Sequence, residues 1–184
     1  MSVAAIAIDN FLDTTKWNTI QSGISEYLNA PFYSENRTSL HTDINSWIKD
    51  KLSTLGLWNN LWEDEIKLFS SINVLPKNIN VEEGDKEHGG YHREDGGYIY
   101  YIHPAWDTSW GGNLKFKDCD GSIIEPKPNR LVWVNPDIWH GIEVVNDSAS
   151  TNRITVVAWP SGTVTYPSAD AVSYTHLTLP TMEL

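Results

Sequence analysis

The order of local patterns along the chain constrains its fold most: helical periodicity comes first, and short β-forming runs follow from Pro76 onward. Turn signals such as Asp95-Gly96-Gly97 and Gly111-Gly112 separate these runs at intervals typical of an antiparallel sandwich or barrel. Helices followed by strands, without β-α-β alternation, predict an α+β, mainly β fold with a jelly-roll-like pair of sheets. The predicted strands are residues 98–102, 113–117, 130–134, 141–145 and 153–159.

Two amphipathic helices are predicted before the strands. The apolar residues of segment 14–28 recur at spacings of three and four, and Asp13 or Thr14 is the predicted N-cap. The apolar residues of segment 44–55 form a second stripe. This stripe ends at Gly56, a residue type that tolerates the left-handed backbone found just after a helix.

The chain has 184 residues, of which 40% are apolar, so it can bury a sizeable core within one domain. We expect a single domain over residues 1–171, with helical support over about 1–66 and a jelly-roll core over about 67–166. Within these parts, residues 57–66 continue the helical pattern and residues 67–75 are better described as a strand. Residues 172–184 resemble a translated sequencing-adaptor read-through and are interpreted as non-native.

Charge and cysteine content exclude several classes of protein. The formal net charge is −11 and no basic tract occurs, which disfavours a nucleic-acid partner. The single cysteine, Cys119, excludes a disulfide framework or a multi-cysteine zinc site within one chain. No apolar run approaches the roughly 20 residues of a membrane helix, and the first eight residues lack the positive start of a signal peptide. We therefore expect a cytoplasmic protein without a membrane partner.

Two histidines and an acidic residue are candidates for a metal site. His92 and Glu94 stand at i and i+2, which places both side chains on one face of an extended strand. His140 precedes another predicted strand, which a folded pair of sheets can bring opposite the first two. Two imidazoles and one carboxylate form the facial triad of non-haem Fe(II) oxygenases, which leaves coordination positions open. The sequence predicts iron ligation by His92, His140 and one residue of Glu94-Asp95.

Arg153 is the candidate anchor for an anionic co-substrate. It stands at the start of the strongly β-forming run 153–159. A guanidinium matches a carboxylate with two parallel hydrogen bonds and does not lose its charge in a protein. In a chain this acidic, a dianion needs such a local cation, so we predict that Arg153 binds the distal carboxylate of a dicarboxylic co-substrate.

The strand motifs between about residues 70 and 160 resemble the prolyl-hydroxylase branch of the Fe(II)- and 2-oxoglutarate-dependent oxygenases. The resemblance implies a double-stranded β-helix of about eight strands, supported on one face by the N-terminal helices. The order and spacing of the segments match that branch, and the segments are 98–106, 110–114, 125–132, 139–144 and 153–159.

The resemblance also implies roles for individual residues. His92 and His140 are iron ligands, Arg153 pairs with the C5 carboxylate of 2-oxoglutarate, and Tyr101 adds a hydrogen bond to that group. Trp159 lines the pocket. The implied cofactors are Fe(II), 2-oxoglutarate and O2, with ascorbate as an optional addition. The implied reaction is hydroxylation of an unactivated C–H bond with release of succinate and CO2. The resemblance favours a prolyl residue of a peptide or protein as the substrate. Free amino acids or other small molecules are the alternative substrates.

The sequence departs from the family pattern at the acidic ligand. Members of the branch carry aspartate two residues after the first histidine, whereas Glu94 occupies that position here and Asp95 follows. Strand geometry favours Glu94, while Asp95 requires the chain to kink into the following turn. Either Glu94 or Asp95 can therefore be the acidic iron ligand.

The sequence also allows an alternative function and contains other histidines. A cupin-like binding module with the same sheets and no redox turnover is the alternative function. His88 is a weaker ligand candidate because Gly90, at i+2, supplies no carboxylate. We assign His41 and His103 to structure or surface. The sequence does not predict an oligomeric state.

Overall fold

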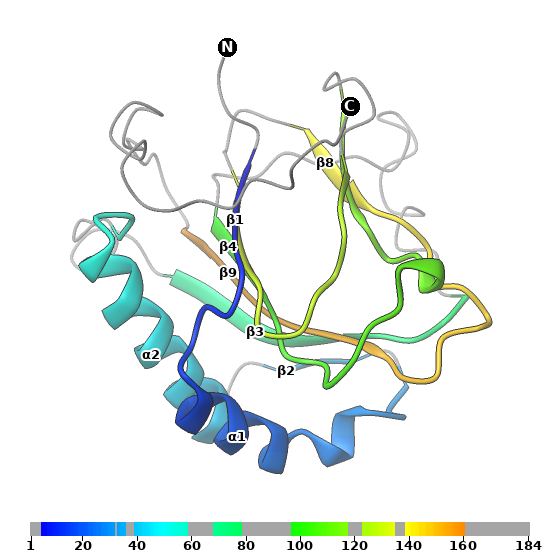
Figure 1. Ribbon diagram of the computed structural model, residues 1–184, viewed down its shortest axis with the longest axis horizontal. Coiled ribbons are helices and arrows are strands. Elements are labelled where there is room, and N and C mark those ends of the chain that lie inside the picture. The colour runs from blue at the N-terminus through cyan, green and yellow to red at the C-terminus, as the bar shows by residue number, and fades with distance from the viewer. Residues whose placement is uncertain are drawn as a thin grey trace.

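The computed structural model describes the chain in seven segments, and two sheets and two α-helices make up most of them (Figure 1). For residues 33–35, 39, 68–70 and 159–160 it describes the backbone alone. The segments are residues 5–31, 33–35, 39–58, 68–78, 97–117, 123–134 and 139–160.

The strands form one large and one small antiparallel sheet within the described residues. In order across the large sheet, the strands are β1 (Ala5–Ile8), β7 (Leu131–Val134), β4 (Gly97–Tyr101), β9 (Arg153–Pro160), β3 (Leu68–Leu75) and β2 (Tyr33–Glu35). The strands of the small sheet are β6 (Ile123–Ile124), β5 (Leu114–Phe116) and β8 (His140–Ile142). The mainly β, jelly-roll fold predicted from the sequence is confirmed.

Both helices lie against one face of the large sheet, and the small sheet lies on the other side (Figure 1). Helix α1 (Thr14–Gly23) begins where the Asp13 carboxylate accepts a hydrogen bond from the Lys16 backbone N–H at 3.0 Å, as the N-cap prediction requires. Helix α2 (Ser39–Thr54) ends just before Gly56, whose φ is +69°. Short 3-10 turns occupy Ser25–Tyr27 and Thr108–Trp110. None of the described helices is both long enough and apolar enough to cross a membrane.

Alternate residues of the central strands face two different cores. On β4, Tyr98 and Tyr100 pack into the core beneath the helices, whereas Ile99 and Tyr101 pack into the core between the sheets. Because successive side chains of a strand point to opposite faces, β4 and its neighbours are buried on both sides. This explains why their sequences lack polar and apolar alternation.

The structure differs from the sequence-based expectation at several elements. Helix α1 ends at Gly23, short of the predicted residue 28, and β8 covers His140–Ile142 where 141–145 was predicted. Strands β1 and β2 come from the segment expected to be helical support, and β6 was not predicted. The helix expected over residues 57–66 does not include 57 and 58, because the positive φ of Gly56 has already turned the chain. The rest of that helix and residues 172–184 lie outside the described residues.

Candidate functional site

The candidate site lies in the interior between the two sheets, at one end of strand β9. Ile154, Val156 and Ala158 belong to the helix-side core, and Val157 belongs to the core between the sheets. Arg153 and Thr155 share the parity of Val157 along the strand. Both polar side chains therefore enter the interior between the sheets.

Arg153 is buried inside this interior, with only 2% of its surface exposed. Its Nε donates a hydrogen bond to the Gly112 carbonyl at 3.0 Å, and one Nη donates to the Tyr101 hydroxyl at 3.2 Å. Within the described part of the chain, no carboxylate lies at ion-pairing distance from it. A buried charge without a counter-charge is costly. The surroundings of Arg153 therefore fit an anionic ligand, and its role in binding a co-substrate carboxylate stays a prediction.

A row of polar residues runs across three adjacent strands beside Arg153. Strand register places Thr155 of β9 opposite Tyr101 of β4 on one side and opposite Asn73 of β3 on the other. The Ser71 hydroxyl donates to the Asn73 side-chain oxygen at 2.8 Å. The sequence analysis identified Tyr101 but not Thr155 or Asn73. Thr155 could have been found because it stands two residues after Arg153, on the same face of the strand.

His140 is the first residue of β8 and is 1% exposed. It stands opposite Phe116 of β5, which belongs to the core between the sheets. Directly opposite residues of an antiparallel pair present their side chains to the same face, so His140 also faces the interior. Arg153 donates a hydrogen bond to the carbonyl of Gly112, which precedes the first residue of β5, whereas His140 lies opposite its last residue. His140 and Arg153 thus lie toward different ends of the interior.

The other predicted ligands cannot be placed. His92, Glu94 and the alternative Asp95 lie outside the described residues, as does His88. Trp159 lies on β9 opposite Phe69, but its side chain is outside the description, so its predicted place in the pocket stays a prediction. Among the described residues, no three His, Cys, Asp or Glu side chains form a group that could hold a metal ion. His140 supplies one buried imidazole of the type that such a site needs.

His103 was assigned to structure or surface from the sequence, and the structure places it beside Arg153. Its side chain is completely buried, and the centre of its ring lies 4.6 Å from that of Trp106 and 5.6 Å from that of Tyr101, both in tilted contacts. Burial, and then the charge of Arg153, lowers the pKa of His103 to about 3, with a partial offset from the Ile154 carbonyl. Its position two residues after Tyr101 was the sequence signal that could have revealed this placement.

An apolar cluster that includes Trp106 lies beside His103 and Arg153. Trp106 and Trp110 pack there with buried Leu75, Val145 and Ala149. The Trp106 indole N–H donates to the Gly111 carbonyl at 3.1 Å. A Cβ at Gly112 would lie 3.2 Å from both the Arg153 side chain and the Trp106 ring, so the cluster borders the Arg153 side chain.

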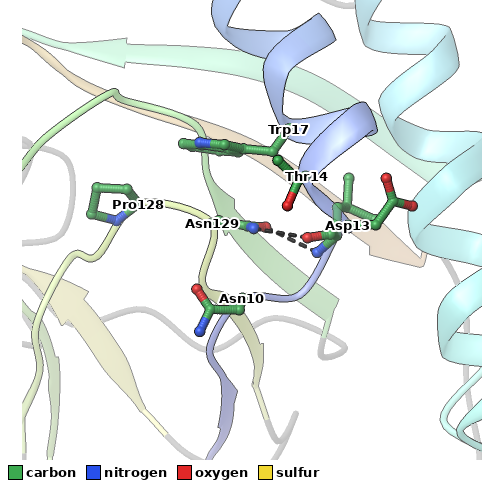
Figure 2. Close-up of a pocket in the computed structure, with 7 residues that line it drawn as sticks. Asn10, Asp13, Thr14, Trp17, Pro128 and Asn129 are labelled. Atoms are coloured by element: carbon green, nitrogen blue, oxygen red, sulfur yellow. Dashed lines mark hydrogen bonds between the residues drawn. The ribbon is translucent and has the colours of Figure 1, made fainter.

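A pocket of about 430 Å³ lies elsewhere, at the N-terminal end of α1 (Figure 2). The side chains of Trp17, Pro128 and Asn10 surround it, and Asn129 lies at its base. The Asn129 amide is engaged with the Leu12 backbone through two hydrogen bonds of 2.9 Å. The pocket is lined by none of the candidate site residues.

The sequence matches the model of a known family. A model of the 2OG-Fe(II) oxygenase superfamily matches residues 30–161, which include His92, His140 and Arg153. No curated protein sequence matches the chain.

Solved structures share the fold at low sequence identity. A prolyl hydroxylase from Trichoplax adhaerens, in complex with a hypoxia inducible factor peptide fragment, has a TM-score of 0.57 at 15% identity, covering 94% of this chain and 87% of its own. A prolyl-4-hydroxylase from Pseudomonas putida has a TM-score of 0.52 at 12% identity, covering 85% and 91%. NgTET1 in complex with 5mC DNA has a TM-score of 0.50 at 15% identity, covering 90% and 75%. At these identities the likeness shows the fold alone.

Proposed function

The chain belongs to the 2OG-Fe(II) oxygenase superfamily, and on that basis we propose that it hydroxylates an unactivated C–H bond of a prolyl residue in a peptide or protein. The superfamily uses Fe(II), 2-oxoglutarate and O2. In the family reaction, one oxygen atom of O2 enters succinate as 2-oxoglutarate loses CO2, and the other becomes the new hydroxyl group.

The buried guanidinium of Arg153 is the observation that carries this proposal. It lies inside the interior between the sheets and has no carboxylate partner among the described residues. A bound carboxylate would satisfy its charge and its remaining N–H groups together. 2-Oxoglutarate carries such a carboxylate at the end opposite its keto acid group.

Each residue then has a distinct task. Arg153 binds the distal carboxylate, and the Tyr101 hydroxyl, already hydrogen-bonded to Arg153 at 3.2 Å, holds the guanidinium and the carboxylate in register. Buried Leu114, Phe116 and Val157 exclude water from the space between the sheets. When bound, iron supplies the redox chemistry and the place at which the co-substrate and O2 meet.

We propose His92, His140 and Glu94 as the iron ligands, with Asp95 as the alternative acid. The buried imidazole of His140 and the donor types of the other two support this assignment, since two imidazoles and a carboxylate suit Fe(II). Trp159, two residues beyond Val157 on β9, is proposed to line the pocket.

The prolyl substrate is supported by the fold that the chain shares with prolyl hydroxylases, one of which was solved with a peptide. A small-molecule substrate is the other class for the experiment to consider. The net charge of −11 disfavours DNA or RNA, although NgTET1 shares the fold and was solved with DNA. The single cysteine fits a cytoplasmic location. We further propose that residues 1–171 are the functional domain and that 172–184 are dispensable.

The test has two stages. Purified protein is mixed anaerobically with Fe(II) and 2-oxoglutarate, and we expect the visible absorption band of the metal and co-substrate complex. Oxygen is then admitted with proline-containing peptides, free proline or no substrate, and succinate and the mass of each peptide are measured. Succinate formation that rises with a peptide, together with one added oxygen on proline, is the expected result.

Two results would change the assignment. Absence of both the band and succinate at full iron loading would favour a cupin-like binding module. Succinate formation that rises with free amino acids and not with peptides would support the dioxygenase assignment. It would also show that the substrate is a free amino acid and not a prolyl residue of a peptide.

A further inference from the structure

A second polar residue, His103, lies beside the guanidinium of Arg153 and has no role in the function proposed above. The Tyr101–Thr155 pairing of β4 and β9 continues past the end of β4, because the Ile102 N–H donates to the Ile154 carbonyl at 3.0 Å. One residue further, His103 comes opposite Arg153. His103 and Tyr101 share one face of the extended chain, so the imidazole faces the same interior as the Tyr101 hydroxyl.

Some buried polar atoms of the described residues near Arg153 make no hydrogen bond. Among the described residues, neither ring nitrogen of His103 makes a hydrogen bond, and the Oγ1 of Thr155 is also unsatisfied. The Ile154 carbonyl lies near His103 but does not reach hydrogen-bond geometry, and it already accepts from Ile102. A buried polar atom without a partner costs about 1–3 kcal/mol. Native proteins rarely retain such atoms unless a ligand or water completes them.

The ring of His103 is held in a fixed orientation. It packs between the ring of Trp106, with centroids 4.6 Å apart, and the ring of Tyr101, with centroids 5.6 Å apart. Trp106 is itself fixed by its hydrogen bond to the Gly111 carbonyl. A polar group that neighbouring rings hold in place needs no further ordering when a ligand binds, so it is preorganised.

The protonation state of His103 suits an anion bound at Arg153. Burial and the adjacent Arg153 charge lower its pKa to about 3, so the imidazole is neutral at ordinary pH. A neutral imidazole carries one N–H donor and one acceptor nitrogen. The donor is available to a carboxylate, and the site keeps the single positive charge of Arg153.

We infer that His103 is a co-substrate-binding residue, whose ring N–H donates a hydrogen bond to the distal carboxylate of 2-oxoglutarate beside Arg153 and Tyr101. This rests on the proposed function and adds a third side chain to the carboxylate site. Thr155 borders the same site through its pairing with Tyr101. The inference distinguishes His103 from an ordinary core histidine, whose ring nitrogens would bond to protein groups.

The test measures 2-oxoglutarate affinity in the Fe(II)-loaded protein by anaerobic calorimetry. His103→Phe keeps an aromatic ring and removes the donor, and we expect roughly 10- to 100-fold weaker binding, as for loss of a hydrogen bond to a charged group. His103→Asn and His103→Gln each restore a donor near one ring nitrogen, and one of them should recover affinity to within roughly threefold. Fe(II) affinity should be unchanged in all three.

The matched control is His41→Phe. His41 is another buried histidine, but it lies on α2, beneath the helix-side face of the large sheet. This variant should bind 2-oxoglutarate like the wild type. In turnover, His103→Phe should raise the KM for 2-oxoglutarate while kcat at saturation stays close to the wild-type value.

A second measurement does not depend on the variants folding. In wild-type protein labelled with nitrogen-15 at histidine, addition of 2-oxoglutarate should shift a ring N–H resonance of one histidine that is not an iron ligand. Unchanged affinity in His103→Phe, or no such shift in a wild type that binds 2-oxoglutarate, overturns the inference and leaves the proposed function intact. A wild type that does not bind 2-oxoglutarate overturns both.

Discussion

The guanidinium of Arg153 donates a hydrogen bond to the Tyr101 hydroxyl at 3.2 Å, and its central carbon lies 4.9 Å from the centre of the Tyr101 ring. The same ring therefore contributes a hydrogen bond and a cation–π contact to one buried cation. The Gly112 carbonyl holds the Nε side at 3.0 Å. Two fixed contacts orient the planar group before any ligand arrives, and they define the site that the predictions below test.

Arg153→Lys should weaken 2-oxoglutarate binding by roughly 10- to 100-fold, because an ammonium cannot make two parallel hydrogen bonds to a carboxylate. Steady-state kinetics with varied 2-oxoglutarate should show this as a raised KM, with Fe(II) affinity retained. Arg130→Lys is the control, because Arg130 pairs with Asp9 outside the interior and should leave that KM unchanged. Equal effects of the two substitutions would contradict the assignment of Arg153.

Tyr101→Phe should weaken 2-oxoglutarate binding by roughly three- to tenfold, since it removes one hydrogen bond and retains the cation–π contact. The neighbouring Tyr100→Phe is the control. Its hydroxyl donates to Asn129 at 2.7 Å on the helix side of the sheet, so this change should lower the free energy of unfolding without altering 2-oxoglutarate affinity. Calorimetric titration and urea unfolding of both variants separate the two effects.

Gly112→Ala should displace Arg153 and weaken co-substrate binding. A Cβ at this position would lie 3.2 Å from the Cδ of Arg153 and 3.2 Å from the Trp106 ring, on a backbone with a φ of +69°. Gly56→Ala has the same φ of +69° with no atom within 4 Å of its Cβ. Each variant should lose about 1–2 kcal/mol of stability from the left-handed backbone.

Only Gly112→Ala should also raise the dissociation constant of 2-oxoglutarate. The measurement is the same calorimetric titration in both variants. A similar dissociation constant in Gly112→Ala and Gly56→Ala would mean that Arg153 tolerates the added methyl group and that its position is less tightly set.

The stability of the fold should decrease as the pH falls from about 7 to about 5. Burial holds the pKa of His103 at about 3 in the folded protein, below its ordinary value of 6.5. Above about pH 6.5 the imidazole is neutral in both states; below it, only the unfolded chain takes up the proton, so unfolding becomes more favourable. His103 alone should cost about 2 kcal/mol at about pH 5.

Urea unfolding of the wild type and His103→Gln at the two pH values checks this. The wild type should lose more stability on acidification than the variant, by about the amount due to His103. Burial also lowers the pKa of His41, which adds a loss of the same sign to both proteins. An identical pH dependence in the two proteins would show that His103 is not held neutral by the fold.

His140→Ala should abolish Fe(II) binding, whereas Arg153→Lys should retain it, since the two residues lie toward different ends of the interior. The acidic ligand is identified by comparing Glu94→Ala with Asp95→Ala. We expect the Glu94 variant to lose iron and the Asp95 variant to keep it, measured by metal content after gel filtration. The reverse pattern would assign the ligand to Asp95.

Local sequence patterns predicted the parts of this fold that depend on neighbouring residues. The spacing of apolar residues located α1 and α2, and Asp13 and Gly56 marked a helix start and a helix stop. The β-forming run that begins at Arg153 became β9. Turn chemistry and side-chain alternation act within a few residues, so they are legible without a partner strand.

The short strands β1 and β2 were missed for the opposite reason. They have four and three residues, and strands this short are defined by the partner they pair with and not by their own periodicity. β1 pairs with β7, about 125 residues away in the chain. The position of His103 was missed in the same way, because its place beside Arg153 arises from the register between β4 and β9.

The amino-acid sequence by itself determined where the residue types of the proposed site stand. These are an arginine at the start of a strand (Arg153), a tyrosine on a strand (Tyr101) and an imidazole beside another strand (His140). Only the tertiary structure decided that Arg153, Tyr101 and His103 share one buried end of the interior and that His103 is neutral there. The physical reason is that strand pairing between distant segments sets both proximity and burial. These in turn set the electrostatic environment of each group, which no local pattern encodes.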